Sequence, residues 1–498
     1  EGGNTTFQFS NDRTDFTLDG NRATDHASNT LQFARGTNIA TITGSIESSG
    51  SVYFEFSGIS SHLTVAGGVS AVEMSHNYFH FKEGDDTVDL GSLYAEAGGN
   101  NSLEFETGQK EVIIREGMEA AESGRNRISF YDDYEAARLA VGHISSGPNG
   151  ENEIRLGGGG SIEVSGDMSA DHGINTIEIS NSSSELRIDG DLLAAAGGFN
   201  RIRTSDAAAS VTIGGRLSAG ASNEEQEDSP SENRLDLDAG DNFFALGAGM
   251  QALATGSRNM IQSWDGNDVY HLKGTYAAVS GAENTIETRA GDDRIFLDGQ
   301  VGKGGLNILA GDGYDVLTLS AADAESMGQN YREWLEDAAS QNGEYSFAEW
   351  GFESIQVDLA GQHGELDSLA WLGDLVDAYN TSSATPLALE LNLDSYGRNL
   401  SLSDLFSGQD DDIFSGVNLG GDNQNILAVE GGLVDNGINA FTLTVNGDSG
   451  DTVRLSDDWM FNGDDSGGVG LTYSYYTTGY DLLLVQSEIA VVCVAYIT

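Results

Sequence analysis

The feature that most constrains this chain is a repeat of about 25 residues that recurs between residues 4 and 320. Each repeat begins with Asn, alternates apolar and polar residues, turns through Gly and Asp, and then alternates again. A fixed period of this length is the signature of a solenoid, a propeller or an array. The repeats begin at Asn4, Asn29, Asn77, Asn101, Asn126, Asn152, Asn175, Asn200, Asn233, Asn259, Asn284 and Asn307.

The interior of the repeat predicts strands. Apolar residues come in pairs two apart, which places both on one face of a short strand. Glycine recurs about 15 residues after most starts, too often for helices, and permits the positive φ of a sharp corner. Three strands and three corners per repeat predict an all-β fold, a parallel β-solenoid (β-helix) of about thirteen coils. One of these coils, around Tyr53, lacks its Asn.

The recurring Asn has two interpretations. Its side chains could form a ladder of amides inside the coils, each bonded to the backbone of a neighbouring coil. Alternatively, the row could contact a ligand. We favour the structural ladder.

The repeat pattern breaks at residue 322. Apolar residues at helical spacing within 322–351 predict an amphipathic helix, which would cap the solenoid by covering its open strand edge. A strand over 352–361 and a short helix over 367–380 follow, and then more β segments, either a second unit or an irregular continuation. The predicted parts are a solenoid over 1–321, a mixed helical segment over 322–384 and a C-terminal β domain over 385–498.

The net charge of the chain limits the classes of partner that it can bind. It has 79 acidic and 23 basic side chains, a formal net charge of −56. Such a charge opposes compaction unless cations bind, and it argues against nucleic acid or an anionic membrane as a partner. No apolar run is long enough to predict a membrane span. Cys493 is the single cysteine, so no internal disulfide is possible, and the opening EGGN predicts a processed form or a fragment.

Candidate metal ligands cluster in the acidic corner of several coils. If the coils stack in register, these side chains form a column with a spacing of about 4.8 Å, and Ca²⁺ between coils would relieve their repulsion. The alternative is ordinary Asp-Gly turn chemistry. The predicted ligands are Asp241, Asn242, Asn267, Asp268, Asp292, Asp293, Asp312 and Asp315, with the isolated pair Asp85 and Asp86 as a further candidate.

Two regions resemble a known family. The segments AGDNFFALGAG, DGNDVYHLKG, AGDDRIFLDG and AGDGYDVLTLS resemble hemolysin-type (RTX) calcium-binding repeats. The segments FESIQVDLAG, LTVNGDSGDTVRLSDDW and GVGLTYSYYTTGYDLLLVQSEIAVV are similar to the C-terminal region of bacterial surface proteins and adhesins secreted by the type I pathway. The resemblance implies export, folding outside the cell in Ca²⁺, and a role in a surface layer, a biofilm matrix or adhesion.

Signals of catalysis are few. The chain has no HExxH, GxSxG, P-loop or Rossmann motif, and His76 and His80 lack an evident third zinc ligand. Trp264, Tyr270 and Tyr276 could line a glycan groove, but packing in the core or corners is favoured.

We therefore expect that the protein is not an enzyme. We expect an extracellular, calcium-stabilised structural or adhesive solenoid that self-associates into a layer, filament or matrix. Cell-surface glycans are a further possible partner. The alternative is a Ca²⁺-dependent carbohydrate-active β-helix enzyme of the lyase or epimerase type, since such folds host these activities.

Overall fold

The computed structural model describes most of the chain. By its internal contacts the chain divides into two compact units, residues 1–291 with 305–309 and residues 292–304 with 310–498. The described residues are 4–23, 27–131, 137–180, 184–205, 208–220, 230–322, 324–339, 350–359, 369–382, 387–392, 399–401, 416–419, 426–429, 442–446, 451–456, 460–466, 472–478, 481–486 and 489–494.

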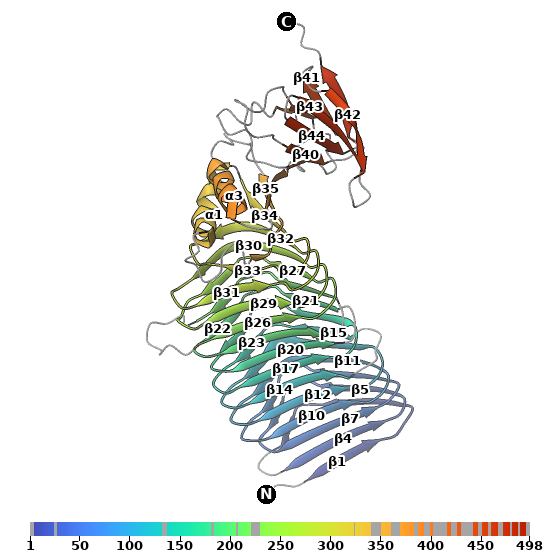
Figure 1. The fold of residues 1–498 in the computed structure, drawn as a ribbon. Helices are drawn as coiled ribbons and strands as arrows, with labels where there is room; N and C mark the ends of the chain where they lie inside the picture. Colours follow the sequence, from blue (N-terminus) through green and yellow to red (C-terminus); the bar gives the residue numbers. More distant parts are fainter. Residues whose placement is uncertain are drawn as a thin grey trace. The chain divides into compact units, whose positions relative to one another are not determined.

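The first unit is a parallel β-solenoid, which confirms the predicted fold class (Figure 1). Its first face is a 13-stranded sheet in which each strand pairs in parallel with the strand of the next coil. The strands of this sheet are β1 (Thr5–Phe9), β4 (Ser28–Ala34), β7 (Ser51–Ser57), β10 (His76–Phe81), β12 (Asn100–Phe105), β14 (Arg125–Phe130), β17 (Glu151–Leu156), β20 (Ile174–Ser180), β23 (Phe199–Ser205), β26 (Glu232–Leu237), β29 (Arg258–Ser263), β31 (Glu283–Glu287) and β33 (Asn307–Leu309).

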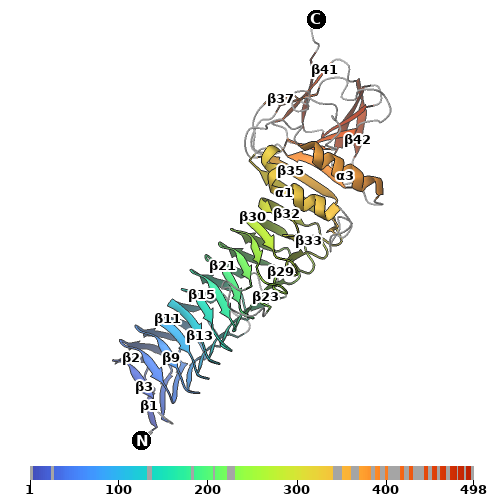
Figure 2. The same cartoon turned by 90° about the vertical axis from the view of Figure 1, so that its left-hand side faces the viewer.

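Two further faces complete each coil, as the three-strand pattern predicts (Figure 2). Long strands cross both faces at Asp85–Ala95, Lys110–Ala120 and Val269–Ala278, and the pairing of the first two shifts register between Leu90 and Ser92. The strands of these faces are β2 (Arg13–Leu18), β3 (Asn21–Ala23), β5 (Thr37–Ile42), β6 (Ile46–Ser48), β8 (Ser60–Val65), β9 (Val69–Ala71), β11 (Asp85–Ala95), β13 (Lys110–Ala120), β15 (Ala137–Val141), β16 (Ile144–Ser146), β18 (Gly160–Val164), β19 (Met168–Asp171), β21 (Ser184–Ile188), β22 (Leu192–Ala195), β24 (Ala209–Ile213), β25 (Leu217–Ala219), β27 (Phe243–Leu246), β28 (Met250–Ala252) and β30 (Val269–Ala278).

Inward side chains stack from coil to coil and fill the interior of the first unit. Successive phenylalanine rings lie 4.6–5.0 Å apart between centroids along one row. Such ring pairs each add about 0.5–1.5 kcal/mol to the free energy gained by burying their area. The row comprises Phe9, Phe33, Phe56, Phe81, Phe105 and Phe130 and continues in register with Leu156 and Ile179.

The recurring Asn forms the predicted amide ladder. From Asn77 to Asn259, each Nδ2 donates to Oδ1 of the Asn in the next coil over 2.7–2.9 Å. The same Nδ2 also donates to a backbone carbonyl, as Asn175 does to Ser169 O at 2.6 Å. These side chains are buried. The structural interpretation of the Asn row is therefore confirmed.

Three positions depart from the predicted row. Val52 occupies the Asn position in the coil around Tyr53. Thr5, rather than Asn4, pairs with Asn29. Asn307 pairs with Thr285, which places it one residue away from the row of Asn284. Repeat spacing alone could not reveal these shifts, because coil lengths vary and only strand pairing defines the register.

The second unit continues to pair strands in parallel. One series comprises β32 (Arg294–Val301), β34 (Val316–Ala321), β35 (Ser354–Leu359), β36 (Ala388–Asn392), β38 (Gly416–Asn418), β40 (Thr442–Asn446) and β44 (Asp481–Gln486). A second parallel sheet comprises β37 (Asn399–Ser401), β39 (Ile426–Val429), β41 (Thr452–Ser456) and β45 (Ala490–Val494). An antiparallel ribbon is formed by β42 (Met460–Ser466), β43 (Thr472–Thr478) and β44.

Both predicted helices are present. Helix α1 (Ala324–Ala339) buries Tyr331, whose hydroxyl oxygen lies 2.8 Å from both Leu297 O and Ser320 O, two acceptors for its single proton. The second helix is α3 (Ala370–Ser382). The edge of β34 is paired with β35, so α1 does not cover that edge, and its role as a cap of the solenoid stays a prediction. Parallel pairing thus runs past residue 321, while the three-part division of the chain stays a prediction.

Neither helix in the described part of the chain is long and apolar enough to cross a membrane.

Candidate functional site

The acidic corner contains two rows of side chains rather than the single predicted column. In the first unit, Asp85, Asp241 and Asn267 are exposed. Asp85 Oδ1 accepts a hydrogen bond from the backbone N–H of Gln109 at 3.0 Å, and Asp241 Oδ1 accepts one from Asn267 at 2.9 Å. The outer carboxylates therefore already bond to the backbone of the next coil.

The neighbouring residues of the same corner point inward and are buried. They are Asp86, Asn242 and Asp268. Asn242 Oδ1 accepts from the backbone N–H of Ala209 at 2.9 Å, and Asp268 Oδ1 accepts from that of Asn242 at 2.8 Å. The single predicted column is wrong because adjacent residues of an extended chain point to opposite sides.

The second unit repeats this arrangement with more negative charge. Asp292 is exposed and accepts from the backbone N–H of Tyr314 at 2.9 Å. Asp293 and Asp315 are fully buried, and Asp315 Oδ1 accepts from the backbone N–H of Asp293 at 2.8 Å. Glu353 Oε2 accepts from the backbone N–H of Asp315 at 2.7 Å. The last predicted ligand, Asp312, is exposed.

Asp86 has an internal counter-charge. Lys110 Nζ, itself nearly buried, forms an ion pair with Asp86 Oδ2 and donates to Gly84 O at 2.6 Å. Burial raises the pKa of Asp86 to about 6, and the lysine opposes that rise. Pairing with lysine thus offers a second way, besides Ca²⁺, to neutralise this carboxylate.

Asp315 lies in a more strongly acidic environment. Burial, followed by the charges of Asp293, Glu353 and Asp292, raises the pKa of Asp315 to about 7. Its Oδ2 is buried and has no hydrogen-bond partner among the described residues. In the first unit, burial and the charge of Asp241 raise the pKa of Asp268 as well. A bound cation would lower both pKa values.

The corner residues suit Ca²⁺ in chemistry but do not form a complete site. Carboxylate and amide oxygens are the ligands that Ca²⁺ prefers, and the buried Oδ2 of Asp315 has no hydrogen-bond partner among the described residues. Among the residues that the structure describes, however, no three acidic, histidine or cysteine side chains converge as a metal site. The predicted ligation by these residues therefore stays a prediction.

A row of buried polar residues in the first coils was not anticipated. Strand pairing aligns Thr14, Asn38, Ser61, Asp86 and Lys110 on successive rungs. Both polar atoms of the Asn38 amide are buried without a hydrogen-bond partner in the described structure. These residues are far apart in the sequence and have no common motif, so only the register could have revealed them.

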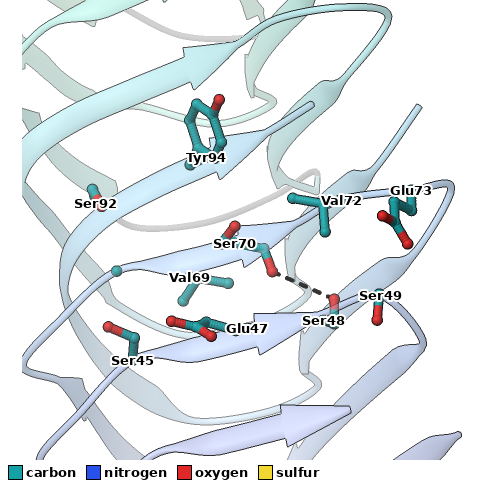
Figure 3. Close-up of a pocket in the computed structure, with 11 residues that line it drawn as sticks. Ser45, Glu47, Ser48, Ser49, Val69, Ser70, Val72, Glu73, Ser92 and Tyr94 are labelled. Atoms are coloured by element: carbon teal, nitrogen blue, oxygen red, sulfur yellow. Dashed lines mark hydrogen bonds between the residues drawn. The ribbon is translucent and has the colours of Figure 1, made fainter. Parts of the chain in front are cut away.

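A groove in the first unit is a second candidate site (Figure 3). Its volume is about 690 Å³, and it lies over β6, β9 and β11. Serines, two glutamates and one tyrosine provide most of its polar lining. The lining residues are Ser45, Glu47, Ser48, Ser49, Gly68, Val69, Ser70, Val72, Glu73, Ser92 and Tyr94.

The aromatic and histidine side chains singled out in the sequence contact other residues of the protein. Tyr270 and Tyr276 are buried, which confirms their assignment to the core. Trp264 lies in the corner after β29 and is 45% exposed, and the Arg289 guanidinium carbon lies 3.7 Å from its ring centroid, so Trp264 packs in a corner rather than in the core. His80 contacts Glu106 Oε1 at 2.7 Å, and His76 is exposed.

These observations define a parallel β-solenoid protein with an acidic corner and a hydroxyl-lined lateral groove. No family model, curated protein or solved structure matches the chain.

Proposed function

We propose that this chain is an extracellular structural and adhesive protein, a β-solenoid that Ca²⁺ stabilises and that associates with copies of itself at a cell surface. The proposal combines the acidic corner, the net charge of −56 and the resemblance to hemolysin-type repeats and type I-secreted surface proteins.

The environment of Asp315 is the observation that carries the calcium part of the proposal. A buried carboxylate surrounded by Asp292, Asp293 and Glu353 is unfavourable unless a proton or a cation neutralises it. At Asp86, by contrast, the carboxylate is neutralised within the chain, because it forms an ion pair with Lys110. No lysine or arginine forms an ion pair with Asp315 among the described residues. We therefore infer that external Ca²⁺ takes this role at the corner of Asp315, with oxygens of the solvent supplying most of its coordination.

The interior of the first unit supports a structural role. The Asn ladder and the phenylalanine row run through many coils and bond each coil to the next. Stability in such a repeat comes from contacts between neighbouring units, and exposed strand edges pair readily with other chains. A stiff body of this kind suits assembly into a layer, a filament or a biofilm matrix.

The first test is thermal unfolding followed by circular dichroism in Ca²⁺ and in excess chelator, with light scattering on the same samples. We expect Ca²⁺ to raise Tm, because a ligand at about 100 times its Kd adds about 2.7 kcal/mol of stability. Scattering is expected to increase with Ca²⁺ as copies associate.

Two variants separate the acidic corner from general effects of charge. Asp315→Asn is expected to reduce the Ca²⁺-induced rise in Tm. Asp191→Asn is the matched control, since Asp191 is a corner carboxylate already paired with Arg216 Nε at 3.1 Å. Equal melts of the wild-type protein in Ca²⁺ and in chelator would contradict the calcium proposal, and unchanged scattering would contradict self-association.

A Ca²⁺-dependent carbohydrate-active enzyme is the alternative. Turnover of a uronate polymer by the purified protein would favour it over the structural role. The groove over β6, β9 and β11 does not favour such substrates, because its lining contains glutamates and no lysine or arginine.

A further inference from the structure

The groove over β6, β9 and β11 is created by small residues on three successive coils. Strand pairing aligns Ile46, Val69 and Leu93, so the preceding residues Ser45, Gly68 and Ser92 also lie on consecutive rungs. A Cβ at Gly68 would lie 2.3 Å from Ser92 Oγ, so a larger residue there would displace the serine hydroxyl. The floor of the groove is therefore lined by small residues.

A second outward row forms the wall of the groove. Glu47, Ser70 and Tyr94 are aligned on consecutive rungs. Figure 3 shows the Tyr94 ring on the strand beyond Ser70, with Glu47 on the opposite side. The small side chain of Ser70 thus leaves a notch between a carboxylate and an aromatic ring.

The wall is ordered by hydrogen bonds. The Tyr94 hydroxyl donates to Glu96 Oε2, and this bond, burial and nearby acids raise the Tyr94 pKa to about 12. The ring therefore stays neutral and held in place at physiological pH. Beneath this row, the buried Ser48 Oγ lies 3.4 Å from Ser70 O and 3.1 Å from Ser75 Oγ, and Ser75 Oγ donates to Ser48 O at 2.6 Å.

The chemistry of the lining selects the ligand. Serine hydroxyls both donate and accept, glutamates accept from hydroxyl groups, and a tyrosine ring packs against the apolar face of a sugar. No cationic side chain lines the groove, so an anionic ligand would be repelled. The rungs are about 4.8 Å apart, close to the advance of one sugar residue in an extended glycan.

We propose that this groove binds a neutral oligosaccharide, with Tyr94 as the packing surface and with Glu47 and Ser70 as hydrogen-bonding partners. The site shares no residue with the acidic corner, so it goes beyond the proposed calcium-stabilised assembly. It also names the site at which the expected glycan partner would bind.

The test is calorimetric titration of the full chain in Ca²⁺ with three neutral hexasaccharides: cellohexaose, xylohexaose and the hexamer of N-acetylglucosamine. An oligogalacturonate hexamer serves as the anionic probe and pentalysine as a cationic peptide. We expect at least one neutral probe to bind and the anionic probe not to bind. The proposal would be overturned by no binding of any neutral probe, or by pentalysine binding that the groove variants weaken equally.

Four variants place the binding in the groove. Ser70→Trp, which fills the notch, and Tyr94→Ala, which removes the ring, are each expected to weaken binding at least tenfold. Tyr94→Phe keeps the ring and is expected to stay within threefold of the wild-type affinity. Tyr53→Ala removes an exposed tyrosine of β7, outside the groove, and should have no effect. Thermal melts of each variant show that it is folded, and undiminished binding by folded Ser70→Trp would overturn the proposal.

Discussion

At the scale of single residues, Asp86 and Asp315 show how surroundings decide the role of a corner carboxylate. Both side chains are buried and both have a raised pKa. Lys110 lies against Asp86, whereas Asp315 is surrounded by other acids. Removing charge should therefore have opposite effects at the two positions. At Asp86 it would leave the lysine unpaired, and at Asp315 it would relieve repulsion.

The pH dependence of stability tests this view of Asp315. Its folded pKa is about 7, compared with an ordinary value of 3.8. Between these values the unfolded chain has lost the proton while the folded chain retains it, so this group makes stability fall as pH rises from about 4 to 7. Asp315→Asn removes this contribution and should stabilise the Ca²⁺-free protein at pH 8 by about 1–3 kcal/mol.

The measurement is Tm in chelator from pH 5 to pH 8. Asp315→Asn should lose less stability across this range than the wild-type protein. Asp191→Asn should follow the wild-type profile. Identical slopes for Asp315→Asn and the wild-type protein would mean that Asp315 titrates normally.

At the scale of elements, the amide ladder holds each coil to the next. Asn175 accepts from Asn152 Nδ2 at 2.9 Å and donates to Asn200 Oδ1 at 2.8 Å. Replacing it removes these bonds and leaves buried partners unsatisfied, which is costly in the low-dielectric interior. Asn307, by contrast, is outside the ladder row.

The comparison of these two asparagines is a matched test. Asn175→Ala is expected to cost about 2–4 kcal/mol of stability, because it breaks several buried hydrogen bonds. Asn307→Ala should change stability by less than about 0.5 kcal/mol. Chemical denaturation measures the difference, and native-state hydrogen exchange locates it, since a repeat protein can open coil by coil. Similar effects of the two substitutions would show that the ladder contributes little.

At the scale of the whole molecule, the net charge of −56 opposes folding. Ion pairs such as Arg155 with Glu178, 3.2 Å between Nε and Oε2, neutralise only part of it, because the chain has 23 basic side chains for 79 acidic ones. Most of the remaining negative charge must therefore be screened or neutralised by ions from the solvent.

Salt and Ca²⁺ should therefore stabilise the protein to different extents. Raising NaCl from about 0.02 M to about 0.5 M shortens the screening length severalfold and should raise Tm in chelator by several degrees. Millimolar Ca²⁺ at matched ionic strength should raise Tm further, because binding adds to screening. If NaCl at the same ionic strength reproduces the whole effect of Ca²⁺, the cation acts by screening alone. If salt lowers Tm, self-repulsion is not the main electrostatic cost.

Much of the local structure is determined by the sequence alone. The repeat, the pairs of apolar residues and the corner glycines predict the parallel solenoid, and the Asn starts predict the ladder found from Asn77 to Asn284. These features are periodic, and the period follows from strand geometry and the length of one coil.

The tertiary structure decided which side chains meet across coils. It assigned Asp292 to the surface and Asp293 to the interior, and it continued the pairing from β34 to β35 beyond the predicted boundary. It also brought Lys110 to Asp86. The physical reason is register: coils differ in length, and a shift of one residue exchanges inward and outward side chains. Repeat spacing defines the coil, but only hydrogen bonding between coils determines which residues share a row.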